Sequence, residues 1–246
     1  MNIIKSILPY GLVSGKSTFS IKKFVKNFLP NGIVVAINKS NANKRYTLEY
    51  LKSRYVSDLT ENEKWVLLAI LLYLERTQSN TEYLEIGIYA GGTIKFMKDN
   101  SQNSNFTGID LFEDFKPSND NTHFWKNYSQ AMVWEALGKD RVTLFKGFSV
   151  QCLEELKVKG KMFDFIFIDG NHTYKATKDD FKASLPLIKK NGYVAFHNCS
   201  PGASEEDKYY IRLDGGPWML THELLSNPDF KLVTSIDRIR IFQKLN

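Results

Sequence analysis

Short apolar runs alternate with amphipathic stretches along most of the chain. The strand-like runs cover 82–88, 105–111, 142–147, 164–169 and 192–198, and the helix-like stretches cover 91–100, 124–138, 149–160 and 175–190. Strands that alternate with helices in this way are typical of βαβ units and of a parallel sheet covered on both faces. Ligands bind such sheets beyond the carboxyl ends of the strands, so the polar residues there are the candidates for function.

The most clearly defined helix is predicted at 61–76. The segment "TENE" provides Thr60 as N-cap and Glu63 three residues later, and the apolar run Val66–Leu74 follows. This combination is a capping box that opens a buried helix. Residues 1–58 are less regular, and we predict an N-terminal extension there, either a small cap or a contact in a homo-oligomer. The main domain is predicted at 59–246.

Composition restricts the class of protein. The chain has 246 residues, of which 43% are hydrophobic and 24% charged, as expected for a soluble protein with one main domain. No apolar run approaches the ~20 residues that a membrane-spanning helix needs. The N-terminus lacks a clear signal peptide, and the two cysteines form no CxxC pair, so we expect a cytoplasmic protein without disulfides or a zinc site.

Charge adds little to this picture. The formal net charge of +6 is spread along the chain. It favours either an anionic small molecule or weak contact with nucleic acid, and does not choose between them. The stretch "GLVSGKST" resembles a phosphate-binding P-loop, but Gly11 and Gly15 enclose three residues and that motif needs four. We therefore discount a nucleoside triphosphatase.

The stretch "EYLEIGIYAGGT" (82–93) is a strand followed by a glycine-rich turn and a helix. Glycines allow close approach of a ligand, and the helix N-terminus offers unpaired N–H groups. Tyr89 stands where the dinucleotide fingerprint needs its second glycine, which disfavours a nicotinamide-dependent oxidoreductase. Glu85 lies two residues before Gly87 and suits a ligand with a cationic or polar head.

The next two strands end in candidates for binding a nucleoside. Asp110 ends the strand 105–111, and a carboxylate there can accept hydrogen bonds from both ribose hydroxyls. Phe148 and Ser149 follow the strand 142–147. Phe148 could lie against an adenine ring, and Ser149 could bind the adenine edge or cap the next helix.

The segment "FDFIFIDGNHTYKA" (163–176) is a buried strand that ends in polar residues. If it pairs with "GYVAFHN" (192–198), then Asp169, His172, His197 and Asn198 emerge side by side. Carboxylate and amide oxygens with an imidazole form a plausible half-shell for a divalent cation. The segment 198–218 follows, and we predict an acceptor-binding loop or lid with Tyr209, Tyr210, Arg212 and Trp218 as substrate contacts.

These motifs resemble, in order and spacing, the class I S-adenosylmethionine-dependent methyltransferases. The segments concerned are "YLEIGIYAGGT", "GIDLF", "FKGFS", "FDFIFIDGNHTYKATKDDFKASLPLIKKNGYVAFHN" and "GGPWMLTHELL", within residues 60–246. The likeness is greatest to the branch of macrocin and mycinamicin sugar O-methyltransferases, through the D-G-x-H-x-Y segment and a later strand that ends in H-[DN].

The resemblance implies an α/β, Rossmann-like, mostly parallel seven-stranded sheet with helices on both faces. Its last two strands would be antiparallel, at 230–236 and 238–245. It further implies that Glu85, Gly87, Tyr89 and Gly91 line the methionine part of S-adenosylmethionine, that Asp110 holds the ribose, and that Phe148 flanks the adenine.

On the acceptor side, the resemblance implies that Asp169, His197 and Asn198 bind Mg²⁺ or Mn²⁺ and that His172 is the base. Asn198 stands where an aspartate is usual, which leaves less charge to hold a metal ion. Asp169 is then either a metal ligand or the group that orients His172. The expected acceptor is a sugar hydroxyl, on a nucleotide-linked sugar or a glycan precursor in polysaccharide biosynthesis.

Two other functions stay open at this point. One is a metal-dependent O-methyltransferase for a phenol or catechol, and the other is a non-catalytic subunit that binds the cofactor. A nucleic-acid base methyltransferase is disfavoured because "IDGNHTY" occupies the place of its N/D-P-P-Y/F segment. We therefore expect no nucleic-acid partner.

Overall fold

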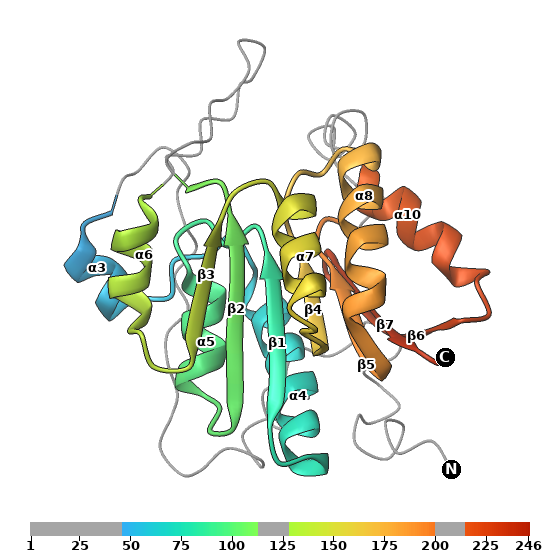
Figure 1. Cartoon of the computed structure of the whole chain (residues 1–246), viewed down its shortest axis with the longest axis horizontal. Helices are drawn as coiled ribbons and strands as arrows, with labels where there is room; N and C mark the ends of the chain where they lie inside the picture. The colour runs from blue at the N-terminus through green and yellow to red at the C-terminus, as the bar shows by residue number, and fades with distance from the viewer. Residues whose placement is uncertain (1–45, 113–127, 200–214) are drawn as a thin grey trace.

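A single seven-stranded sheet forms the centre of the molecule. The computed structural model describes residues 46–112, 128–199 and 215–246 (Figure 1). The strands are β1 (Thr81–Ile86), β2 (Ser104–Asp110), β3 (Val142–Lys146), β4 (Phe163–Ile168), β5 (Ile188–Phe196), β6 (Phe230–Ile236) and β7 (Ile239–Lys244). Their order is β3-β2-β1-β4-β5-β7-β6. β1 to β5 pair in parallel, whereas β7 is antiparallel to both β5 and β6, which confirms the expected fold.

Helices cover both faces of this sheet (Figure 1). They are α3 (Leu48–Ser53), α4 (Glu61–Thr77), α5 (Gly92–Asp99), α6 (Gln130–Leu137), α7 (Ser149–Val158), α8 (Tyr174–Ser184), the short 3₁₀ helix η3 (Leu185–Leu187) and α10 (Gly216–Leu225). Side chains of α3 to α6 share one hydrophobic core with the sheet, and side chains of α7, α8 and α10 share the other. Each face of the sheet is therefore packed against helices.

β4 shows why a mainly apolar run is needed at this position. All six of its residues are buried. Phe165 and Phe167 belong to the core under α4 and α5, and Ile166 and Ile168 belong to the core under α7 and α8. Because successive side chains of a strand point to opposite faces, a central strand of a doubly covered sheet is largely apolar. The exception in β4 is Asp164, which is buried and pairs with Lys189 at 2.8 Å.

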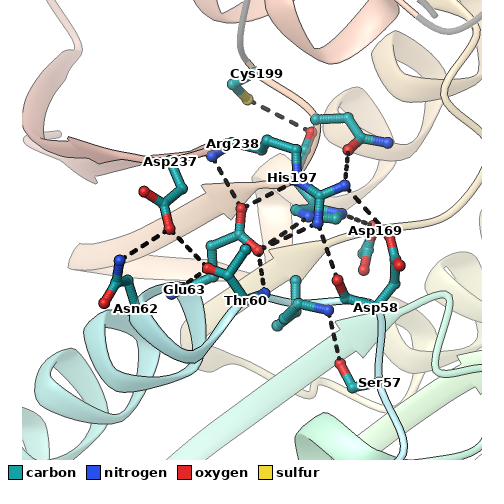
Figure 2. Close-up of polar contacts among 12 residues, drawn as sticks. Ser57, Asp58, Thr60, Asn62, Glu63, Asp169, His197, Cys199, Asp237 and Arg238 are labelled. Atoms are coloured by element: carbon teal, nitrogen blue, oxygen red, sulfur yellow. Dashed lines mark hydrogen bonds and ion pairs between the residues drawn. The ribbon is translucent and has the colours of Figure 1, made fainter. Parts of the chain in front are cut away.

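α4 begins as its sequence predicts. Thr60 Oγ1 accepts a hydrogen bond from the Glu63 amide at 3.2 Å, and Glu63 Oε2 accepts one from the Thr60 amide at 2.6 Å. Both halves of the capping box are therefore present. The helix is buried along most of its length, and its first turn lies beside the carboxyl ends of β4 and β5 (Figure 2).

One predicted element was wrong in its length. The helix expected at 175–190 ends at Ser184, and Pro186 lies in the 3₁₀ turn that follows. β5 begins already at Ile188, and its pairing with β4 jumps from Ile188 to Tyr193. Asn191 has a φ of +62°, so the chain turns within this excursion. The prediction extended the helix to residue 190 because lysines, here at 189 and 190, are common in the last turn of a helix.

Residues before 59 contribute to the main core where they are described. Tyr46, Leu51 and Val56 are buried in the same cluster as α4 and α5. The predicted boundary at residue 58 and the role of residues 1–45 stay predictions. Cys152 and Cys199 are free and buried, in agreement with the expectation of no disulfide. Within 46–112, 128–199 and 215–246, no helix is long and apolar enough to span a bilayer.

Candidate active site

Three carboxylates lie at the carboxyl edge of neighbouring strands. The strand order reverses between β1 and β4, which is the point where open α/β sheets bind ligands. Glu85 lies in β1, Asp110 ends β2, and Asp169 follows β4 directly. The Asp169 amide donates to the Ile86 carbonyl at 2.8 Å, so the ends of β1 and β4 are held side by side.

The predicted glycine turn follows β1 and leads into α5. Gly87 has a φ of +84° and Gly91, the N-cap of α5, has a φ of +76°. A Cβ at Gly87 would lie 2.2 Å from the carbonyl oxygen of Asp169. Gly87 therefore permits the close approach of the loop after β4, a reason that sequence reasoning did not give. Tyr89, with a φ of +50°, packs edge-on against Tyr128 at 5.5 Å between ring centroids.

Asp110 holds this turn in place. Its Oδ2 accepts hydrogen bonds from the amides of Ile88 at 2.8 Å and Tyr89 at 2.9 Å, and its Oδ1 accepts one from Phe112 at 2.8 Å. Burial raises the pKa of Asp110, and these backbone donors oppose the rise. The carboxylate predicted to bind a ribose thus also fixes the backbone beside it.

Glu85 is the most deeply enclosed of the three carboxylates. It is 2% exposed, and Tyr83 donates a hydrogen bond of 2.8 Å to its Oε2. Burial raises the pKa of Glu85 well above its ordinary value, and the negative charges of Asp169 and Asp110 raise it further. A positively charged ligand between these carboxylates would relieve that electrostatic cost.

Phe148 and Ser149 follow β3 but have different surroundings. Phe148 is the N-cap of α7, and 64% of it is exposed at the carboxyl edge of the sheet. Ser149 is the first residue of α7, and its hydroxyl donates a short hydrogen bond to Asp180 of α8. Ser149 is therefore engaged with the neighbouring helix and does not cap α7.

The four polar residues predicted to meet after β4 and β5 do lie together. His197 Nδ1 is 2.8 Å from Asp169 Oδ1, and His172 Nε2 is 3.3 Å from the same oxygen. Asn198 Nδ2 is 2.8 Å from His172 Nδ1. His197 is 1% exposed, whereas the His172 side chain is 24% exposed.

Arg238, in the turn between β6 and β7, fixes the orientation of Asn198. Its Nη1 donates to Asn198 Oδ1 at 3.4 Å. A guanidinium can only donate, so the amide oxygen faces Arg238 and the amide nitrogen faces His172. His172 Nδ1 must then be an acceptor, which leaves the ring proton on Nε2, towards Asp169. This tautomer follows from the hydrogen-bond partners.

Glu63 completes the network from the opposite side (Figure 2). It is fully buried, and its Oε2 lies 3.5 Å from His197 Nε2, an ion-pair contact rather than a well-aligned hydrogen bond. Its Oε1 accepts from the Arg238 amide at 2.9 Å and from Arg238 Nε at 3.3 Å. Sequence reasoning identified Glu63 only as a helix cap, because nothing in "TENE" marks a second role.

This arrangement favours charged forms throughout. Burial lowers the pKa of His197, but Asp169 and Glu63 outweigh it and raise that pKa to about 9. Burial raises the pKa of Glu63, but His197, Arg238 and the Thr60 amide bring it down to about 2. The pKa of Asp169 is likewise below its usual range because the opposing effects of His197 and His172 exceed that of burial. The result is an imidazolium between two carboxylates.

The donor set was tested for a divalent cation. Donor atoms of Asp169, His172 and His197 all lie within 4.8 Å of one another, as a metal cluster would require. However, two of these three donors are imidazole nitrogens, so the cluster offers a single carboxylate. Mg²⁺ also prefers oxygen ligands, and the Asn198 oxygen faces Arg238. These residues do not fit a Mg²⁺ site.

The predicted substrate contacts can be assessed only in part. Tyr209, Tyr210 and Arg212 lie outside the described residues. Trp218 lies in the first turns of α10, partly buried, and its ring packs on His222 at 4.2 Å between centroids. The Gly216 amide donates to the His172 carbonyl at 2.9 Å, so the start of α10 is joined to the loop that carries His172.

Comparison with known proteins points to a methyltransferase domain. Residues 84–199 match the model of a methyltransferase domain family. A protein of Acanthamoeba polyphaga mimivirus, known as uncharacterized protein R132, is 27% identical over 161 residues, 60% of this chain. The match covers 66% of that relative, so the chain spans just under two thirds of its length.

Solved structures share the fold. An O-methyltransferase from Bacillus cereus in complex with SAH is 17% identical, with a TM-score of 0.53 over 77% of this chain and 83% of that one. MycE, a methyltransferase of the mycinamycin biosynthetic pathway, in complex with Mg and SAH, is 16% identical, with a TM-score of 0.54 over 82% of this chain and 56% of that one. Residues 84–199 therefore match a methyltransferase domain, and the chain shares the fold of solved O-methyltransferases.

Proposed function

We propose that the chain transfers a methyl group from S-adenosylmethionine to a sugar hydroxyl, with His172 as the base. The acceptor would be a nucleotide-linked sugar or a glycan precursor, as in polysaccharide biosynthesis. The observation that carries this proposal is the pairing of His172 with Asp169 beside the three-carboxylate edge of β1, β2 and β4. The preference for a sugar rests on the D-G-x-H-x-Y form of that segment.

The donor would lie along the glycine turn. S-adenosylmethionine carries a positive sulfonium and a positive amino group, which suits an edge lined by Glu85, Asp110 and Asp169. Asp110 already accepts backbone hydrogen bonds and would accept ribose hydroxyls on the remaining side of its carboxylate. The exposed ring of Phe148 offers a flat apolar surface for the adenine. Gly87, Tyr89 and Gly91 would line the methionine part.

The acceptor would approach from the side of His172. Methyl transfer from a sulfonium requires the acceptor oxygen, methyl carbon and sulfur to be in line, and holding that geometry supplies much of the acceleration. As the oxygen attacks, it must lose its proton, and His172 Nδ1 carries the lone pair that can take it. The acceptor hydroxyl would replace the Asn198 amide at Nδ1. Asp169, at Nε2, then stabilises the imidazolium that forms.

Two experiments test this function. Calorimetry with S-adenosylmethionine and SAH measures donor binding, and a methyl-transfer assay on a panel of nucleotide-linked sugars, lipid-linked sugars and catechols identifies the acceptor. Turnover on catechols alone would favour the phenol-type alternative, and donor binding without any turnover would favour a non-catalytic subunit. We expect turnover on a sugar.

A variant of His172 tests the base. His172→Ala should lower kcat by about 100-fold or more, the usual contribution of a general base, with little change in donor affinity. Lys175→Ala is the matched control, because that side chain is 88% exposed and pairs only with Asp179 among the described ion pairs. Near-wild-type turnover of His172→Ala would reject His172 as the base.

A further inference from the structure

Both ring nitrogens of His197 face a carboxylate. Nδ1 lies 2.8 Å from Asp169 Oδ1, and Nε2 lies 3.5 Å from Glu63 Oε2. The three residues come from three different elements, the ends of β5 and β4 and the first turn of α4. His197 and Glu63 are almost completely excluded from water. A neutral imidazole would leave one of these buried carboxylates facing a lone pair, so carboxylates on both sides favour a cation at this position.

Arg238 adds a second positive charge to the same cluster. Its side chain contacts Glu63, Asn198 and Asp58, at 3.3 Å from Nε to Glu63 Oε1, 3.4 Å from Nη1 to Asn198 Oδ1 and 3.3 Å from Nη1 to Asp58 Oδ2. Asp237, the residue before it, accepts hydrogen bonds from the Thr60 hydroxyl at 2.7 Å and from the Asn62 amide at 3.2 Å (Figure 2). The turn between β6 and β7 is thus anchored on the cap of α4.

Two side-chain cations therefore stand where the resemblance implies one divalent ion. The charge brought by His197 and Arg238 together equals the charge of Mg²⁺. His197 contacts Asp169 directly, and Arg238 contacts the oxygen of Asn198, so two of the three implied metal ligands already have a positive partner. Among the three implied ligands, a metal ion would therefore find one carboxylate, which already contacts His197, and one amide oxygen, which already accepts from Arg238.

We propose that His197, enclosed between Asp169 and Glu63 and supported by Arg238, is a built-in substitute for the divalent cation, so that the active site works without a metal. This inference deepens the proposed function and rests on it, because the cluster is an active site only if the chain transfers a methyl group as proposed. Glu63 and Arg238 are positioning residues in this scheme. They hold His197, His197 holds Asp169, and Asp169 holds His172 in the tautomer that can accept a proton.

Metal binding to the full-length wild-type protein tests the proposal without any need for turnover. Mn²⁺ is added to the protein, with and without SAH, and the electron paramagnetic resonance signal of free Mn²⁺ reports how much is bound. We expect no stoichiometric binding up to millimolar Mn²⁺ and no stabilisation in thermal unfolding. Stoichiometric binding that Asp169→Asn abolishes would overturn the proposal.

The methyl-transfer assay provides the second readout. EDTA should leave the rate unchanged, and added Mg²⁺ should not raise it. Loss of activity in EDTA that Mg²⁺ restores would overturn the proposal while leaving the proposed function intact. Conversely, the absence of any turnover would count against the proposed function, and the Mn²⁺ titration would still decide whether the cluster binds a metal.

A matched pair of variants tests the role of His197 itself. His197→Glu replaces the built-in cation by a carboxylate next to Asp169 and should create Mn²⁺ binding and a rise of Tm with Mn²⁺. His197→Gln removes the cation without adding a carboxylate and should bind Mn²⁺ no better than the wild type. Equal Mn²⁺ binding by the two variants would contradict the proposal. If neither variant folds, the wild-type titration still decides.

Discussion

Replacing Glu63 by glutamine isolates the charge of the buried network from the capping of α4. Glutamine at this position of a capping box still accepts the Thr60 amide, so the start of the helix is preserved. The variant loses the ion pairs with His197 and Arg238, at 3.5 Å and 3.3 Å respectively. It also leaves His197 with only one carboxylate partner. We therefore expect a loss of stability with the fold retained.

The magnitude follows from the pKa of Glu63, which is lowered from 4.5 to about 2. One pKa unit corresponds to about 1.4 kcal/mol, so the ionised carboxylate contributes ~3 kcal/mol to the free energy of unfolding at neutral pH. Because a lowered acid pKa stabilises only the ionised form, this contribution is complete above pH 4.5 and is lost as the pH falls through about 2. Unfolding entropies of ~2.1 cal/mol/K per residue convert it to a Tm decrease of ~6 °C for 246 residues.

Thermal and urea unfolding at pH 7.5, followed by circular dichroism, measure this effect. The control is Glu154→Gln, since Glu154 is 62% exposed and pairs with Lys157 on the surface of α7, where a salt bridge contributes little. The control should keep the wild-type Tm within about 1 °C. If Glu63→Gln did the same, the carboxylate would not be held by His197 and Arg238 as described, and the electrostatic reasoning would be wrong.

Three further predictions concern other parts of the site. Gly87→Ala places a Cβ 2.2 Å from the Asp169 carbonyl oxygen and should abolish donor binding in calorimetry. Intact donor binding would refute this close approach. Asp110→Ala removes the acceptor for two turn amides, so donor Kd should rise at least tenfold, from ~1.4 kcal/mol of lost binding. The pKa of Asp180 is raised to about 6 by burial, so its ionised form destabilises the fold as pH rises from 3.8 through 6. Asp180→Asn should therefore raise the free energy of unfolding by up to ~3 kcal/mol at pH 8 and have no such effect at pH 4, whereas a decrease at pH 8 would contradict this.

The alternation of short apolar runs with amphipathic stretches determined the fold class. A parallel strand that is buried on both faces is an apolar run, and such a run can be recognised in the sequence. β4 is buried at every residue, and the capping box at Thr60 and Glu63 marks the start of α4. The sequence also predicted that Asp169, His172, His197 and Asn198 lie together, because all four follow the carboxyl ends of two adjacent strands. The end of α8 was missed because Pro186 and the lysines after it allow either a helix end or a strand start by composition.

Only the tertiary structure decided what these residues contact. Glu63 is separated from Asp169 and from Arg238 by more than a hundred residues of chain, and no local pattern indicates that His197 lies between Glu63 and Asp169. The charge of His197 and the orientation of Asn198 follow from partners brought by α4 and by the turn between β6 and β7. The sequence by itself therefore placed a metal-like cluster at this edge of the sheet, because ligand types can be read from residue types. The protonation of His197 and the orientation of Asn198 depend on partners distant in sequence, and those partners favour a cation supplied by the protein.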